Sequence, residues 1–284
     1  MKKILVPVDF SKTSNIAFDV AFDIAKKDGA DLIALHVVEE ITKDSYRITG
    51  EWSKANWEDR IFTFEMMKKS KAQLEKLVKD PKYDAVRING ELRMGNPYHG
   101  ITTIIAEQKV DLIVMGTKGH TKLSEMVIGT NTEKVVRHSS CPVLTVQGKP
   151  ATTDFKNIVY ATGMNPEEEV FSRMIKRTQQ IYNSTIHLVR INTPADFRRD
   201  RVVMDAMQKF AKKLGLKNYT LNIYNDISEE DGIIYFADSI KADLIGMATH
   251  GRTGFAHVMA GSIAEDVVGR SAKCPVLTFV VKHK

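Results

Sequence analysis

The sequence contains few cysteines and no long apolar run. Only two of its 284 residues are cysteines, Cys141 and Cys274, and neither has a second Cys or a paired His at zinc-ligand spacing. We therefore expect two buried thiols in a reducing compartment. No window approaches the roughly 20 apolar residues of a membrane span, and no signal-like stretch develops before Pro7 and Asp9. These absences predict a soluble, cytoplasmic protein without a membrane partner.

The sequence also lacks the motifs that commonly mark catalysis. It has neither the G-x-S-x-G turn of a nucleophilic serine nor the G-x4-G-K-[ST] phosphate loop. The histidines near the motifs discussed below, His36, His99, His120 and His250, do not pair with one another at metal or triad spacing. We therefore predict no catalytic residue and no metal site built from protein side chains.

Charge is only mildly unbalanced along the chain. The 41 Lys and Arg residues exceed the 35 Asp and Glu residues by 6, which suits an anionic small ligand. Nucleic-acid binding normally concentrates basic residues on one face or interleaves them with aromatics, and here they are spread among the acidic ones. The charge pattern therefore predicts no specific nucleic-acid partner.

An internal repeat is the most informative feature of the chain. The segments that begin at Ile113 and Ile245 align with one inserted residue before Cys274, and both end in Cys-Pro-Val-Leu. Upstream, residues 3–8 align with residues 157–162, and residues 32–38 align with residues 185–191. The chain therefore consists of two homologous halves.

A polar stretch separates the two halves. Residues 148–154 read Gly-Lys-Pro-Ala-Thr-Thr-Asp between two apolar runs, which is typical of a linker. Together with the usual size of a folding unit, this predicts two domains, residues 1–148 and residues 155–284.

Each half alternates short apolar runs with amphipathic helical patterns. This order predicts βαβ units and a parallel sheet that helices cover on both faces. The first half is predicted to have strands at 3–8, 31–38, 84–91, 111–115 and 143–147, and helices at 14–28, 57–79, 97–108 and 130–138. The second half repeats this order. The extra residues of the first half, 39–56 with Trp52, form either a lid or interface or an ordinary surface loop.

Glycines follow the fourth strand of the first half in a pattern typical of a phosphate site. Glycine lets backbone amides approach phosphate oxygens closely, and a helix N-terminus attracts anions. The pattern is G-x2-G-x9-G-T, formed by Gly116, Gly119, Gly129 and Thr130, with Lys118 as a nearby cation and Asn131 and Thr132 as a polar rim. The loop therefore predicts binding of a phosphate-bearing ligand.

Asp9 ends the first strand and should face the same crevice. Ligands of open α/β sheets bind at the carboxyl ends of the strands, where the strand order reverses. A carboxylate there could accept a hydrogen bond from an adenine amino group or a ribose hydroxyl. The alternative is that Asp9 only caps the helix that follows, with Ser11 or Thr13 sharing the task.

Four motifs together resemble the universal stress protein family. They are Val6-Pro7-Val8-Asp9, the strand end His36-Val37, the glycine loop and the closing Cys-Pro-Val-Leu, and the resemblance covers essentially the whole chain as two copies. It implies two tandem Rossmann-like domains of the adenine nucleotide alpha hydrolase type, each an α/β fold with a five-stranded parallel sheet of order 3-2-1-4-5. It also implies that the fifth strands pair the two halves into an intramolecular pseudo-dimer. Whether two chains also form a homodimer remains open.

The ATP-binding branch of that family holds ATP without an obligatory reaction, and ADP or AMP would satisfy the same groups. By resemblance, Asp9 and the backbone of Val37 would meet adenine, while the glycine loop would surround the ribose and phosphates. The implied nucleotide-binding residues are Pro7, Asp9, Val37, Met115, Gly116, Lys118, Gly119, Gly129, Thr130, Asn131 and Thr132. Mg or Mn on the phosphates fits the resemblance, although the sequence shows no carboxylate dedicated to it.

The second half departs from this pattern. Gly163 stands for Asp9, Ala248 for Gly116 and Arg190 for Val37, whereas Gly251, Gly261 and Ser262 are retained. A methyl group at a place of close backbone approach can block a ligand. We therefore predict one strong nucleotide site in the first half and a degenerate second site.

Three functions remain open on the sequence. The first is a stress-response or regulatory protein that binds ATP and changes state with occupancy. The second is a slow ATP hydrolase or a nucleotidyl or phosphoryl transferase that uses the same loop. The third is a structural module that pairs through residues 142–147 and 275–281 without a nucleotide.

Overall fold

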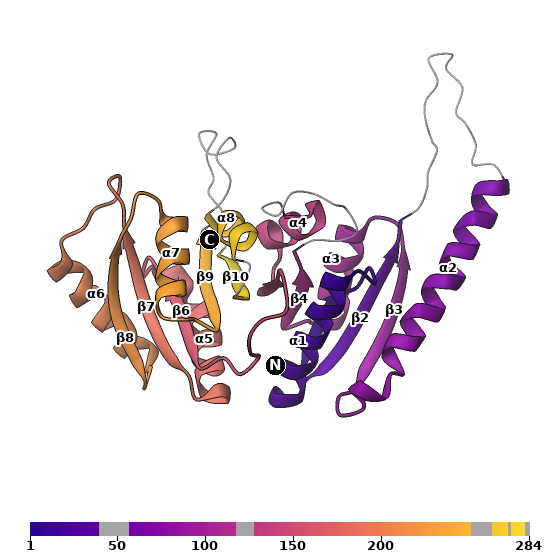
Figure 1. The fold of residues 1–284 in the computed structure, drawn as a ribbon, viewed down its shortest axis with the longest axis horizontal. Helices are drawn as coiled ribbons and strands as arrows, with labels where there is room; N and C mark the ends of the chain where they lie inside the picture. The colour runs from indigo at the N-terminus through magenta and orange to yellow at the C-terminus, as the bar shows by residue number, and fades with distance from the viewer. Residues whose placement is uncertain (40–56, 118–127, 251–262, 272–273, 282–284) are drawn as a thin grey trace, which may run out of the picture.

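A computed structural model describes residues 1–39, 57–117, 128–250, 263–271 and 274–281. Its ten strands form one sheet in the order β3-β2-β1-β4-β5-β10-β9-β6-β7-β8 (Figure 1). Most of the predicted connection 39–56 and the loop residues Lys118, Gly119, Gly251, Gly261 and Ser262 lie outside the described residues.

The first half forms a parallel five-stranded sheet of order 3-2-1-4-5. Its elements are β1 (Lys3–Pro7), α1 (Lys12–Asp28), β2 (Asp31–Val38), α2 (Trp57–Val78), the short 3-10 helix η1 (Pro81–Tyr83), β3 (Ile88–Met94), α3 (Pro97–Gln108), β4 (Leu112–Gly116), α4 (Thr130–His138) and β5 (Val143–Val146). The predicted fold class and strand order are confirmed for this half.

The second half repeats the first with the order 8-7-6-9-10. Its elements are β6 (Asn157–Ala161), the 3-10 helix η2 (Pro166–Glu168), α5 (Glu169–Tyr182), β7 (Thr185–Asn192), α6 (Asp200–Leu214), β8 (Tyr219–Asn225), α7 (Glu229–Ser239), β9 (Leu244–His250), α8 (Ile263–Arg270) and β10 (Val276–Val281). The connection between β7 and α6 is short, as the sequence predicts.

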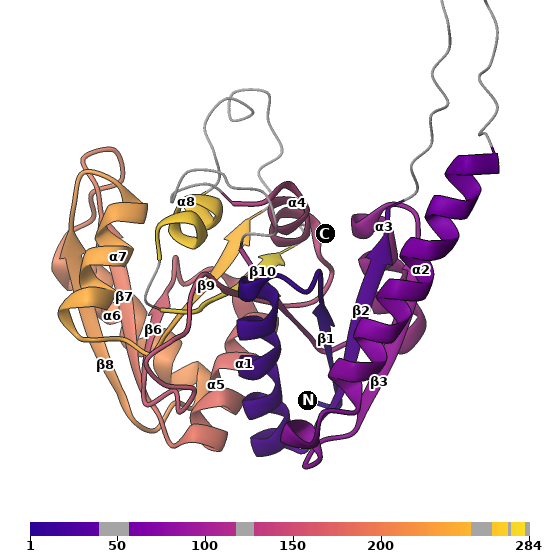
Figure 2. The same cartoon turned by 45° about the vertical axis from the view of Figure 1, so that its right-hand side comes forward.

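Helices cover both faces of the sheet (Figure 2). One apolar cluster joins α1, α2, α5 and α6 to the sheet and contains the fully buried Phe18 and Phe171. The other joins α3, α4, α7 and α8 to the opposite face and contains Ile104 and Val267. Truncating such a buried aromatic to Ala destabilises a protein by about 3–5 kcal/mol. The two clusters thus fix the sheet whose strand ends carry the candidate site.

The third strand begins later than the sequence predicts. The predicted range was 84–91, whereas β3 spans Ile88–Met94. Pro81 starts η1, the buried Tyr83 holds that turn against the core, and the Val86 amide donates to the Tyr83 carbonyl over 3.2 Å. Residues 84–86 therefore complete a turn and cannot join the ladder. This element was misplaced because its apolar pattern continues from the turn into the strand.

The two halves join through their fifth strands. β5 and β10 pair antiparallel, with Leu144 opposite Leu277. The Thr145 hydroxyl donates to the Val276 carbonyl over 3.1 Å, and the Thr278 hydroxyl lies 3.4 Å from the Val143 carbonyl. The strands that the sequence predicts as edge strands therefore pair with each other and join the two five-stranded sheets into one.

Candidate functional site

The first strand end, the fourth strand end and the start of α4 meet at one place. β1 lies between β2 and β4, so the chain order reverses on either side of it. This is where open parallel sheets bind ligands, because the carboxyl ends of the strands and the N-termini of the following helices face one crevice. Asp9, Gly116 and Gly129 all lie at this end of the sheet.

A tight turn orients Asp9. One carboxylate oxygen accepts a hydrogen bond from the Ser11 amide at 2.9 Å, and Phe10 between them has φ 63°. The N-cap of α1 is Ser11, whose hydroxyl accepts from the Ser14 amide. Asp9 therefore stabilises the turn that precedes the helix, and the capping role belongs to Ser11.

Gly116 packs against α1. A Cβ built on this glycine would lie 2.8 Å from the Thr13 Cγ2, closer than real Cβ atoms approach, and 3.1 Å from the Thr13 carbonyl carbon, which is tighter than most real Cβ contacts. The fold itself therefore requires glycine at the end of β4. The sequence offered ligand access as the reason for this glycine, and Thr13 was not recognised as its partner because no local pattern links residues 103 positions apart.

The N-terminus of α4 has no side-chain cap. Gly129 occupies the N-cap position with φ −67° and ψ 143°, a conformation open to any residue. A Cβ there would meet the Thr117 carbonyl oxygen at 3.4 Å and the Thr132 hydroxyl at 4.0 Å, which are ordinary contacts. Among the described residues, nothing in the fold requires glycine at this position.

Two hydrogen bonds hold the start of α4 on β4. The Gly129 amide donates to the Thr117 carbonyl at 2.8 Å, and the buried Thr132 hydroxyl donates to the Gly116 carbonyl at 2.9 Å. The Thr132 side chain thus points into the protein, and its backbone amide is what α4 can offer an anion. Thr130 is exposed and Asn131 half-buried, so both lie nearer the solvent.

The remaining predicted residues line the strand ends less directly. Val37 is half-buried and packs on α3, where a Cβ at Gly100 would lie 2.8 Å from its Cγ2. Met115 is buried in the cluster under α3 and α4, while Pro7 is half-buried at the end of β1. The structure brings these three to the same end of the sheet, but the side chain of Met115 belongs to the core.

His36 supports the Asp9 turn from β2. Its Nδ1 lies 2.7 Å from the Val8 carbonyl oxygen, and its ring packs 4.7 Å from the Phe10 ring between centroids. It therefore holds the backbone that presents Asp9. His36 therefore has a structural role at this turn.

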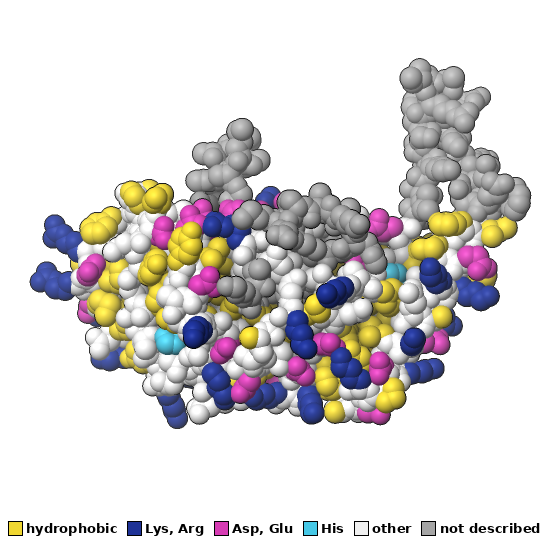
Figure 3. All heavy atoms as spheres, viewed as in Figure 1, with side chains coloured by type: hydrophobic (Ala, Val, Ile, Leu, Met, Phe, Trp, Pro, Cys, Tyr) yellow, Lys and Arg dark blue, Asp and Glu magenta, His cyan; other side chains and the backbone are white. Residues whose placement is uncertain are grey.

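Among the described residues, α4 carries charges of both signs near the crevice. Glu133 lies in the first turn of α4, where a carboxylate opposes an incoming anion, but Arg137 lies 3.4 Å from it. The face drawn in Figure 3 mixes side chains of both signs. The described residues contain no cluster of three or more His, Cys, Asp or Glu that could hold a metal ion. None of the described helices is long and apolar enough to span a bilayer.

The strand register corrects one sequence alignment in the second half. Lys3 pairs with Asp31, and its repeat counterpart Asn157 pairs with Thr185. Arg190 is therefore the counterpart of His36, and the counterpart of Val37 is Ile191 rather than Arg190. The error was one residue, which sequence comparison of short apolar strands could not resolve.

A buried carboxylate occupies the corresponding turn of the second half. Glu168 is 1% exposed and accepts hydrogen bonds from the Tyr160 hydroxyl at 2.9 Å, the Thr162 hydroxyl at 2.6 Å and the Asn165 amide at 3.1 Å. The sequence Asn-Pro-Glu-Glu at 165–168 is a capping box, a signal that could have revealed this network. With Gly163 in place of Asp9, this turn points its polar groups inward.

Arg190 is also withdrawn into the second half. Its guanidinium forms an ion pair with Asp196, and the residue is 8% exposed. The Arg190 Nε is buried without a hydrogen-bond partner among the described residues. In the first half, His36 at this position supports the turn. In the second half, the same position carries a buried cation.

The model of the universal stress protein family matches residues 1–147 and residues 154–280. The chain belongs to the universal stress protein family. A universal stress protein of Methanocaldococcus jannaschii is 33% identical over 146 residues, which cover 51% of this chain and 82% of that protein. One of Bacillus subtilis is 34% identical over 146 residues, 51% of this chain and 98% of its own length.

Solved structures agree with a tandem universal stress protein fold. A universal stress protein from Archaeoglobus fulgidus superposes with a TM-score of 0.76 at 17% identity, covering 97% of both chains. At that identity the likeness concerns the fold alone. It extends over both halves, so the arrangement of two universal stress domains in one chain is shared.

Proposed function

We propose that this universal stress protein binds ATP, or another adenine nucleotide, in the first half and acts as a stress-response or regulatory binding protein. The nucleotide would lie between Asp9 and the start of α4. The other contributing residues would be those predicted above: Pro7, Val37, Met115, Gly116, Lys118, Gly119, Gly129, Thr130, Asn131 and Thr132. The proposal includes domain limits of 1–148 and 155–284.

The observation that carries this proposal is the uncapped start of α4 behind Gly129. The helix begins at the sheet's switch point with a glycine that no described contact requires. A side chain there would project where backbone amides must approach a phosphate oxygen. The Thr117 hydroxyl beneath it is buried and has no partner among the described residues, which adds a polar group with an unmet hydrogen bond.

The second half offers less to a nucleotide. Gly163 supplies no carboxylate, and the polar groups of the turn are already bonded to Glu168. We therefore infer one principal nucleotide site per chain. Mg or Mn, where present, would be held by the phosphates, because the described residues supply no carboxylate cluster for it.

The test is calorimetric titration of the full chain with ATP, with HPLC of the mixture to measure ADP. We expect one site per chain and little ADP. Gly129→Ala should weaken binding about 10–100-fold, since one methyl group in a tight contact costs about 1–3 kcal/mol. The matched control, Gly261→Ala at the repeat counterpart, should leave the affinity unchanged. Two equal sites, or full affinity in Gly129→Ala, would contradict the proposal.

We also propose that the pairing of β5 with β10 makes the chain an intramolecular pseudo-dimer. The support is the antiparallel three-residue register and the two threonine hydrogen bonds across it. Sedimentation of the full chain should then give one 31.9 kDa species at micromolar concentration. A dimer of chains would show that a further surface associates.

A further inference from the structure

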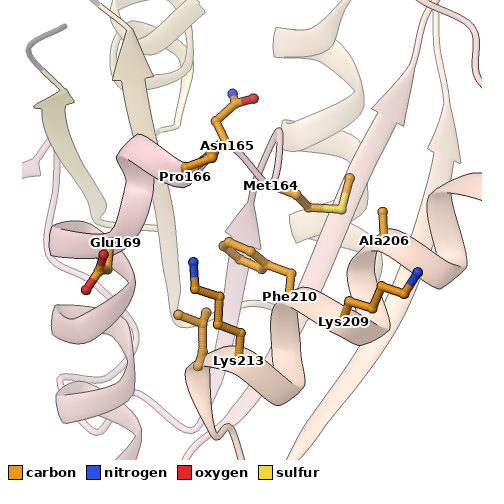
Figure 4. Close-up of a pocket in the computed structure, with 9 residues that line it drawn as sticks. Met164, Asn165, Pro166, Glu169, Ala206, Lys209, Phe210 and Lys213 are labelled. Carbon is orange, nitrogen blue, oxygen red and sulfur yellow. The ribbon is translucent and has the colours of Figure 1, made fainter. Parts of the chain in front are cut away.

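A cavity in the second half lies away from the crevice discussed above. It has a volume of about 230 Å³ and opens between the turn at Met164–Pro166 and α6 (Figure 4). The α6 wall contains Ala206, Phe210 and Leu214, which recur at helical spacing beside the core residues of that helix. The cavity is therefore a gap between α5 and α6 on the face of the sheet that the first apolar cluster covers.

Packing and hydrogen bonds hold the residues at the floor of this cavity in place. Phe210 rests on the fully buried Tyr160, with ring centroids 6.1 Å apart, and Tyr160 is fixed by hydrogen bonds to Glu168 and Ser172 at 2.9 Å. Met164, opposite, is half-buried and held with φ 61° by the turn, its amide donating to the Thr162 hydroxyl at 2.8 Å. The cavity thus offers an aromatic surface on one side and a thioether on the other.

Positive charge borders the apolar floor on one wall. Lys213 extends beside the Phe210 ring into the space between α5 and α6, whereas Lys209 points away (Figure 4). Lys209 is paired with Asp205 at 2.6 Å, and Lys213 has no ion-pair partner among the described residues. The carboxylate that lines the cavity, Glu169, lies on the α5 wall.

We propose that this cavity binds a small aromatic anion. The ring would lie on Phe210 and against Met164, and the anionic group would pair with the Lys213 ammonium. A volume of about 230 Å³ is below the usual range for drug-sized ligands, so the ligand is a compact one such as an aromatic carboxylate. This site is independent of nucleotide binding in the first half.

The experiment uses the full chain with ¹³C-methyl methionine and 1-naphthoate as the probe. Met164 reports the cavity, and Met115, whose side chain lies in the core at the end of β4, reports the first half. Each signal is assigned through the Met→Leu variant of that residue. We expect naphthoate to shift the Met164 methyl signal and leave Met115 in place, with or without ATP. The neutral 1-naphthalenemethanol should bind more weakly.

A matched pair of charge variants tests the assigned cation. Lys213→Gln removes the charge and leaves a shorter polar side chain, and the expected loss of naphthoate affinity is about two- to fivefold, as for a solvent-exposed ion pair. Lys212→Gln, which is equally exposed but does not line the cavity, should have no effect. No Met164 shift at millimolar naphthoate, a shift of Met115 instead, or equal binding of the neutral analogue would overturn the proposal.

Discussion

Arg137, at the end of α4, donates two hydrogen bonds to the carboxylate of Glu265 in the first turn of α8, from Nε at 2.7 Å and from Nη2 at 2.6 Å. The Glu265 side chain is 10% exposed and that of Arg137 is 47% exposed. The repeat counterpart of Arg137 is Gly269, so the contact occurs once. This pair links the helix of the candidate nucleotide site directly to the second half.

Removing the arginine alone should destabilise the protein. Arg137→Met would leave the Glu265 carboxylate nearly buried without its bidentate partner, and we expect a loss of about 1–2 kcal/mol, discounted for the exposure of the arginine. Urea denaturation measures this. The double variant Arg137→Met/Glu265→Leu should recover most of the loss, and a double variant as unstable as the single one would contradict this account.

Gly116 and Gly129 should respond differently to alanine. Gly116→Ala forces a methyl group to 2.8 Å from Thr13, and we expect a loss of about 1–3 kcal/mol in the free energy of unfolding. Gly129→Ala should keep wild-type stability without ligand. Adding Thr13→Ser should restore part of the stability of Gly116→Ala, since it removes the closest atom but leaves the backbone contact. Equal stability of both alanine variants would refute the packing role of Gly116.

Stability should fall at alkaline pH. Burial raises the pKa of Tyr83, Tyr160 and Tyr182, and nearby carboxylates raise each further. The folded state therefore holds these phenolic protons more tightly than the unfolded chain, whose tyrosines titrate near pH 10. Their contribution is complete below about pH 10 and is lost as the pH rises towards the folded pKa values.

Tyr160→Phe isolates one of these groups. We expect it to lower stability at pH 7 by about 1–2 kcal/mol, because Glu168 and Ser172 lose a buried partner. Its stability should then decline less steeply between about pH 10 and pH 11.5. The exposed Tyr235→Phe is the control. An unchanged alkaline slope in Tyr160→Phe would show that another group causes the decline.

Both cysteines should resist thiol reagents in the folded protein. Burial raises the pKa of Cys141 to about 11, and burial also raises the pKa of Cys274. At pH 8 the thiolate fraction is therefore very small. Cys141 is buried as the sequence predicts, whereas Cys274 is half-buried. Reaction with Ellman's reagent should be slow until urea unfolds the chain, when both thiols should react. Rapid labelling of the native protein would contradict the buried environment.

Most of the fold could be predicted because the repeat constrains it twice. The alternation of apolar strands with helices predicted a parallel sheet, and the family resemblance implied its strand order. Pro97, with Gly129 and Thr130, marked helix starts that the structure retains. The predicted start of β3 was wrong because the turn after Pro81 continues the apolar pattern. The counterpart of Arg190 was misplaced by one residue because apolar strands align with equal ease in neighbouring registers.

The candidate site was harder to predict than the fold. Its motif predicted a site at the carboxyl ends of the strands, but the direction of each side chain depends on contacts between distant residues. The Thr132 hydroxyl points inward and donates to the Gly116 carbonyl, and Gly116 packs against Thr13. These relationships come from packing between β4, α1 and α4, which a motif does not encode.

The pairing of β5 with β10 has a consequence for how the chain avoids aggregation. A free fifth strand would present a row of unpaired backbone amides and carbonyls, which is a template for association with other chains. Within the described sheet, β5 shields β10 and is shielded by it, so only β3 and β8 form its outer borders. The covalent link near residue 150 keeps each partner at high local concentration, so each fifth strand is shielded without recruiting a second molecule.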